Sequence, residues 1–135
     1  MPHVFMTCYE ENFSKDVLRS IQEVVRHRAA QLLSVEDRQL TRADFSFHFL
    51  PAGELDDLAK DLMIIIMAHA DEERVPPNAI PDQTAKSIGE EIEMVLSAAW
   101  TEYANNSTYS VSLMLGEMGY FAGEAQSRLM PATDR

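Results

Sequence analysis

The sequence predicts an α+β domain in which two β-α-β repeats form a mixed four-stranded core sheet with two helices on one face. Two observations support this prediction. Apolar residues switch between the two-residue period of strands and the 3.6-residue period of helices, and the order strand, helix, strand occurs twice, over residues 2–51 and 61–125. Right-handed connections in both repeats would place both helices on the same face. The length of 135 residues is that of one domain, 1–135.

The first repeat opens with Met1-Pro2 and an apolar strand over residues 4–9. Ser14 is expected to cap a helix, because the apolar residues behind it recur every three or four positions. The stretch "ADFSFHFLP" alternates phenylalanine with polar residues, which predicts a strand with one apolar face that Pro51 ends.

The second repeat follows the polar, acidic connection "AGELDDLAKD". Its first strand, "LMIIIMAHA", is apolar throughout, which predicts a strand covered on both faces. A proline-rich loop, "DEERVPPNAIPD", leads to a second helix that is expected to run from about Asp82 to Tyr103. The segment "NNST" then breaks the helix, and "YSVSLML" predicts the last strand of the repeat.

Both helices would lie on one face of this sheet, yet the other face also carries apolar side chains. His3 is expected there, on the side opposite to Val4, as an interface residue. Because a two-layer domain has to cover such a face, the pattern predicts oligomerisation.

The composition excludes several classes of partner. A net charge of −11, from 22 acidic and 11 basic residues, disfavours nucleic acid and anionic membranes. No apolar run is long enough for a membrane span, and because polar Glu10, Glu11 and Asn12 follow the first strand directly, we do not expect that strand to be a secretory leader. The single cysteine, Cys8, excludes an internal disulfide and indicates a cytoplasmic protein in which it is a small core residue.

Metal, nucleotide and serine-hydrolase sites have no support in the sequence. His48 and His69 come from two strands that are candidates for neighbours, but no metal-binding spacing accompanies them. A glycine-rich phosphate loop and a nucleophile elbow are also missing from the sequence.

Pro2 is the residue with the clearest chemical potential. Removal of Met1 would leave a secondary amine at the end of a strand, and α-amino groups have pKa values of about 7.7–8.0 in peptides. Burial or a nearby arginine lowers such a pKa further, which would give a neutral base for removing a proton next to a carbonyl. The plain alternative is that Pro2 only begins an edge strand.

The "MPH" start, the duplicated β-α-β pattern and the tail "GEMGYFAGEA" resemble the tautomerase superfamily, and within it the longer, hydroxymuconate-isomerase-like members. The resemblance implies a cofactor-independent isomerase, a homotrimer, acting on a small keto or enol acid with Pro2 as its base. It further implies that Arg74 and Arg42 hold substrate charge, and that Tyr120 and Phe121 line the pocket.

The chain also departs from that pattern, which leaves alternatives open. "YEENFS" has Asn12 and Phe13 where the short-chain tautomerases have an arginine, so a monoanionic or neutral keto acid is expected rather than a diacid. One alternative is a non-catalytic binding or assembly protein with the same fold. Another is dehalogenation or decarboxylation, in which Glu117 or Glu124 would activate water.

Overall fold

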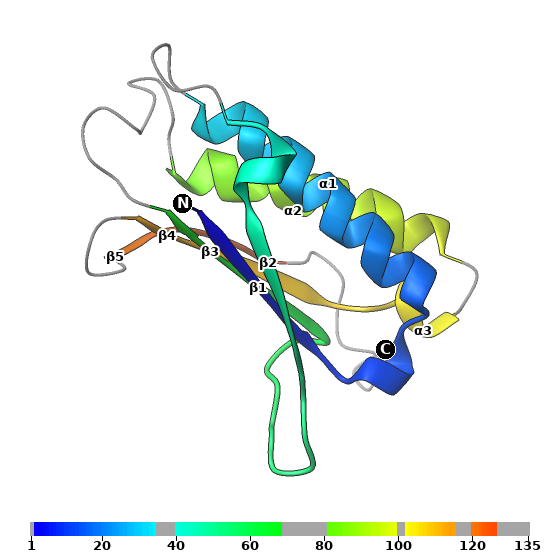
Figure 1. Ribbon diagram of the computed structural model, residues 1–135. Coiled ribbons are helices and arrows are strands. Elements are labelled where there is room, and N and C mark those ends of the chain that lie inside the picture. The colour runs from blue at the N-terminus through cyan, green and yellow to red at the C-terminus, as the bar shows by residue number, and fades with distance from the viewer. Residues whose placement is uncertain (1, 35–39, 69–80, 100–101, 116–119, 127–135) are drawn as a thin grey trace.

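A computed structural model describes residues 2–34, 40–68, 81–99, 102–115 and 120–126 (Figure 1). In chain order its elements are β1 (His3–Cys8), the 3₁₀ turn η1 (Glu10–Asn12), α1 (Lys15–Leu33), the 3₁₀ turn η2 (Arg42–Asp44), β2 (Ser46–Pro51), β3 (Leu62–Ala68), α2 (Pro81–Ala98), α3 (Glu102–Asn105), β4 (Tyr109–Leu115) and β5 (Tyr120–Gln126). Among the described helices, none has both the length and the apolar character needed to cross a bilayer.

The strands form one mixed sheet in the order β2-β1-β3-β4-β5. β1 pairs in parallel with β2, β3 pairs in parallel with β4, and the antiparallel pair β1/β3 joins the two repeats. Figure 1 shows α1 and α2 side by side and antiparallel on one face of this sheet. The predicted two β-α-β repeats, four-stranded core and one-sided helix layer are therefore confirmed.

The two repeats are related by an approximate two-fold rotation, because their first strands run in opposite directions. In the first repeat His3 is paired with Ser46, and in the second Leu62 is paired with Tyr109. β1 consequently begins where β3 ends, with His3 opposite Met67. We call the end of the sheet where β1 begins the Pro2 end, and the opposite end, where β3 begins, the Asp61 end.

Alternate residues of the central strands pack under the helices, as the period of two predicts. On β1 and β3 the fully buried side chains include Val4, Ile64 and Ile66. From α1 they meet Ile21 and Val25, and such a side chain stabilises the fold by about 1.5–3 kcal/mol on burial. The predicted cap of α1 is confirmed, since the Ser14 hydroxyl accepts a hydrogen bond of 3.2 Å from the amide of Val17.

None of the described helices or strands covers the face of the sheet opposite α1 and α2, and we call it the open face. The described part of the chain therefore does not provide the predicted cover on both faces of β3, and Met67 is 36% exposed. Strand register places the following residues on this face: His3, Phe5, His48, Met63, Ile65 and Met67.

Two elements differ from the sequence prediction. The second helix ends at Ala98, and Tyr103 lies in the separate short helix α3. The helix stops there because the side chain of Asn105 donates a hydrogen bond to the carbonyl of Ala99. The strand β5, antiparallel to β4, was not predicted at all, and a register shift interrupts its pairing beside Leu113.

Candidate functional site

Pro2 lies at the start of a central strand and is buried. Its carbonyl accepts a hydrogen bond of 3.0 Å from the amide of Ser46, which holds Pro2 against the start of β2. The alternation of β1 places it on the same side as Val4, under the helix layer. Pro2 therefore begins an inner strand of the sheet, and not an edge strand.

The backbone of Arg42 also lies at the Pro2 end. Arg42 is the first residue of η2, four positions before Ser46, whose amide is bonded to Pro2. The turn is held by Asp44, whose carboxylate accepts a hydrogen bond of 2.7 Å from the amide of Thr41. The side chain of Arg42 is outside the described part of the chain.

Two further predicted site residues reach the same end through strand pairing. β4 is parallel to β3 and ends with Leu115 beside Ala68, at the Pro2 end. β5 starts there, because Tyr120 is paired with Leu115 and Phe121 with Met114. The side chains of both aromatic residues lie outside the described part. Arg74 lies wholly outside the described residues, in the segment that follows β3.

Asn12 and Phe13, the positions where an arginine was missing, lie at the opposite end of β1. This strand has six residues, which at about 3.3 Å per residue puts roughly 20 Å between its ends. The side-chain amide of Asn12 donates a hydrogen bond of 3.2 Å from its Nδ2 to the hydroxyl of Tyr103, and the ring of Phe13 meets that of Tyr103 edge-on. Within one chain these positions are structural and distant from Pro2.

A polar network closes the Asp61 end, and sequence reasoning missed it. The carboxylate of Asp61 accepts hydrogen bonds from the amide of Thr108 at 2.8 Å, from its hydroxyl at 3.0 Å, and from the hydroxyl of Tyr103 at 2.9 Å. Burial, followed by the hydrogen bond to Asp61, raises the pKa of Tyr103 to about 12. The network joins β3 to β4 and holds a neutral phenol, so we read it as structural.

We expected the strand of His48 and the strand that leads to His69 to be neighbours, and this prediction is wrong, because β1 lies between β2 and β3. His69 itself is outside the described residues. His48 instead faces His3 on the open face, with 3.1 Å between its Nε2 and the Nδ1 of His3. Phe5 stacks on the imidazole of His48, with ring centroids 4.8 Å apart. Within the described ranges no cluster of three or more metal-ligating side chains occurs.

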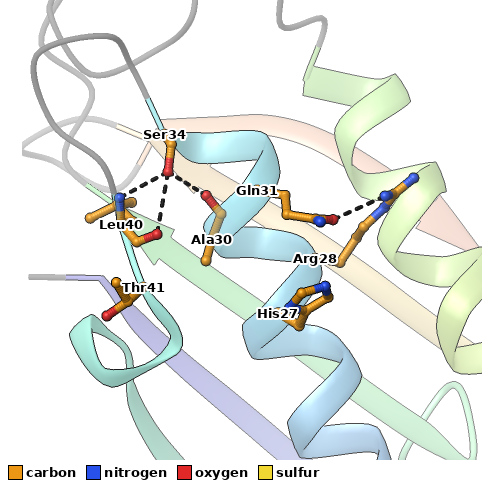
Figure 2. A pocket seen from close by; sticks show the side chains of 7 residues that line it. All are labelled: His27, Arg28, Ala30, Gln31, Ser34, Leu40 and Thr41. Carbon is orange, nitrogen blue, oxygen red and sulfur yellow. Dashed lines mark hydrogen bonds between the residues drawn. The ribbon is translucent and has the colours of Figure 1, made fainter.

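A polar depression lies at the carboxyl end of α1 (Figure 2). The hydroxyl of Ser34 accepts a hydrogen bond of 2.9 Å from the amide of Leu40 and donates to the carbonyl of Ala30, which ends the helix. Arg28 is bonded to Gln31 at 3.1 Å and to Ser87 of α2 at 2.9 Å. Its guanidinium therefore ties the two helices together, and we do not assign this depression a ligand.

Cys8 fits the core role that the sequence predicted. It is fully buried, and burial, with smaller effects of Glu10 and Glu11, raises the pKa of the thiol to about 11. A thiol of this kind is a poor nucleophile at neutral pH.

No known protein family matches the sequence, and no curated protein does. Among solved structures, the chain is similar to a macrophage migration inhibitory factor-like protein of Entamoeba histolytica, with 13% identity over 92% of this chain and 98% of that one, and a TM-score of 0.47. It is also similar to RhCC of Rhodococcus jostii RHA1, with 11% identity over 84% and 76% of the two chains and a TM-score of 0.45.

A third similar structure is the FG41 malonate semialdehyde decarboxylase, with 13% identity over 87% of this chain and 82% of that one, and a TM-score of 0.41. All three are structures of the tautomerase superfamily. At this level of identity and structural agreement the similarity carries no information on activity, so the function of this chain has to be argued from its own residues.

Proposed function

We propose that the chain is a cofactor-independent isomerase that moves a proton on a small keto or enol carboxylic acid, with the nitrogen of Pro2 as the base. The observation that carries the proposal is the position of Pro2, a buried residue at the start of an inner strand. In a chain without Met1, this nitrogen is a secondary amine in surroundings that disfavour its protonated form.

In the proposed reaction the neutral amine removes a proton from the carbon next to the substrate carbonyl, and the electron pair of that C–H bond forms the enolate. The protonated amine then returns the proton to another carbon or to the oxygen, which completes the isomerisation without any net redox change. A base of this kind works best when its pKa is near the working pH, and an α-amino group starts close to neutrality.

Arg74 and Arg42 are proposed to hold the carboxylate and the developing enolate charge of the substrate. Support for Arg42 comes from its backbone, which lies at the Pro2 end. Support for Tyr120 and Phe121 as pocket residues comes from the start of β5 at the same end. A chain of net charge −11 needs such local cations to bind any anion.

We further propose a homotrimer in which the open face is covered by other copies of the chain. The support is the half-buried apolar surface formed by Phe5, Met63 and Ile65, on a side of the sheet where the described residues form no second layer. An apolar sheet face is usually covered by another layer of the fold or by a partner.

A non-catalytic binding or assembly protein is the second candidate. It is favoured by Asn12, which is bonded to Tyr103 at the far end of β1 and brings no cation to Pro2. The two candidates differ in a simple measurement, namely whether the purified protein interconverts enol and keto acids at all.

The experiment compares two forms of the protein, one with Met1 removed and one with Met1 retained, each verified by mass. Ketonisation of phenylenolpyruvate is followed by its ultraviolet absorbance. We expect the processed form to be faster by about 10²–10⁴-fold, the usual contribution of general base catalysis, because the retained methionine makes the Pro2 nitrogen an amide. Equal rates from the two forms would exclude Pro2 as the base.

A further inference from the structure

The connection between β2 and β3 projects from the molecule as an arm, which we define as residues 52–60 (Figure 1). Within the arm Leu55 is 101% exposed, and Leu50, near the end of the preceding strand β2, is 51% exposed. A single exposed leucine is ordinary in proteins. Here its neighbours in the sequence are acidic, because Glu54 precedes it, Asp56 and Asp57 follow it, and all three are exposed.

The arm is held in a defined shape by hydrogen bonds. The carboxylate of Asp56 accepts a hydrogen bond of 2.6 Å from the amide of Gly53, and the amide of Asp56 donates one of 3.1 Å back to the Gly53 carbonyl. The hydroxyl of Tyr9 donates to the carbonyl of Asp56, and the amide of Ala52 donates to the carbonyl of Cys8 at 2.9 Å. Leu55 is thus presented on a preorganised turn, which lowers the entropy cost of binding.

A groove of complementary chemistry lies between α1 and β2, the outermost strand on that side of the sheet. Its apolar floor includes Leu18, Phe47 and Phe49. Lys15 and Arg19 stand at its rim, both exposed, with Glu10 as the one carboxylate of the lining. The cavity measures about 250 Å³, several times the roughly 30 Å³ of a water molecule in the liquid, so it has room for a branched side chain.

We infer that the arm of one chain docks into the groove of a second copy of this chain. The apolar side chain of Leu55 matches the apolar floor, and the carboxylates of Glu54 and Asp57 match the two cations at the rim. Since Leu55 is fully exposed, it does not occupy the groove of its own chain. Charge complementarity therefore points to a second copy as the occupant.

This contact joins two different patches, so every chain offers both an arm and a groove. A contact of this type closes into a ring when the rotation between copies fits, and otherwise builds an open chain. The inference uses neither Pro2 nor the open face, and it stands or falls independently of the proposed isomerase activity.

The first test replaces Leu55 with serine and measures self-association by sedimentation and light scattering. Loss of one buried leucine contact is expected to weaken association by about 10- to 100-fold. Leu55→Met, which keeps an apolar side chain of similar size, is the matched control and is expected to associate like the parent. Association that is unchanged in Leu55→Ser, or a parent protein that is monomeric at micromolar concentration, overturns the inference.

The second test exchanges the charges. A groove variant, Lys15→Glu with Arg19→Glu, and an arm variant, Glu54→Lys with Asp57→Lys, are each expected to lose the arm–groove contact and therefore to associate more weakly than the parent chain. A chain that carries all four changes is expected to associate with itself again and to exclude the parent chain, because both mixed contacts then join like charges. Failure of the fourfold variant to regain association contradicts the arm–groove contact. The contact is also contradicted if the groove binds foreign acidic peptides but not the arm of a second copy.

The two tests also separate this inference from the proposed function. Circular dichroism confirms that each variant is folded, and ketonisation of phenylenolpyruvate is measured on the same samples. Unchanged association with an active enzyme refutes only the arm–groove contact. Lost association in a protein that has no activity in any form refutes only the isomerase proposal.

Discussion

His3 and His48 face each other across the parallel strands β1 and β2, with 3.1 Å between Nδ1 of the first and Nε2 of the second. One imidazole has to donate in this contact and the other has to accept, so the pair in this form carries at most one positive charge. The ring of Phe5 covers His48 on the same face. The contact uses one ring nitrogen of each histidine, so another copy of the chain that covered this face would have to supply partners for the other two nitrogens.

Covering the open face leads to a prediction about assembly. We expect light scattering to give three copies per particle at micromolar concentration, and Ile65→Glu to reduce the particle size, because a carboxylate would be buried without a partner. Ser20→Glu, on the exposed side of α1, is the control and should leave the size unchanged. A stable monomer in the parent protein would refute the trimer.

Arg74 is expected to contribute in two ways to the proposed reaction. Its positive charge would lower the pKa of the Pro2 amine and stabilise the enolate oxygen, so Arg74→Ala should reduce turnover about a hundred-fold or more and shift the acidic limb of the pH–rate profile to higher pH. Lys86→Ala, an exposed charge of α2, serves as the control. The rival view is a weak surface ion pair of Arg74 with Glu72 or Glu73, and it requires an unchanged rate and an unchanged limb.

Gly89 leaves room for the ring of Tyr109 between α2 and the sheet. A Cβ atom added at this position would lie 2.9 Å from Cε2 of Tyr109, which is itself buried. We expect Gly89→Ala to destabilise the fold, since overpacking costs about 1–3 kcal/mol and alanine recovers only about 1 kcal/mol of helix propensity. Urea unfolding measures the change. In a Tyr109→Leu background the same substitution should become stabilising.

The alkaline stability of the protein is expected to depend on Tyr103. The folded state holds its pKa at about 12 against 10.0 for an ordinary tyrosine, so between these values the folded chain binds the proton more tightly than the unfolded chain. Stability that is fully present below pH 10 is therefore lost as the pH rises toward 12. In urea titrations at a series of pH values, Tyr103→Phe should remove this alkaline decrease in the free energy of unfolding. If the free energy of unfolding of the variant falls as steeply between pH 10 and 12 as that of the parent, Tyr103 is not the cause.

Cys8 is expected to resist thiol reagents in the folded protein. Its pKa of about 11 leaves little thiolate at pH 8, and burial adds a steric barrier, so labelling should be at least about a hundred-fold slower than for a free thiol. Full reactivity in denaturant is the control. Rapid labelling of the native chain would mean that β1 opens at equilibrium.

Local patterns were sufficient to predict the four strands and two helices of the repeats, because strand and helix periods are properties of neighbouring residues. They were not sufficient to predict which strands are neighbours, since strand order is set by packing far along the chain. His48 was paired with His69 for this reason, whereas its observed partner is His3. The end of α2 was also missed, because the side chain that stops it, Asn105, comes from the next helix.

In the candidate site, too, the sequence predicted what is local and missed what depends on strand pairing. Pro2 could be proposed from the sequence because a proline directly behind a methionine, followed by an apolar strand, is a local pattern. The approach of η2 and β5 to it follows from strand pairing and has no local signature. The contact between Asp61 and Thr108 bridges residues 47 positions apart, and nothing in the sequence around either residue marks it.

The two-fold relation between the repeats makes the residues before β1 and β3 counterparts, and these residues are Pro2 and Asp61. Asp61 is bound to Thr108 in the strand beside it, whereas Pro2 is bound to its neighbour strand only through its backbone carbonyl. Replacing the side chain of Asp61 therefore removes hydrogen bonds between β3 and β4, whereas replacing that of Pro2 leaves its backbone hydrogen bond to Ser46 in place. During evolution a duplicated scaffold of this kind can change its chemistry at one end while the other end preserves the fold.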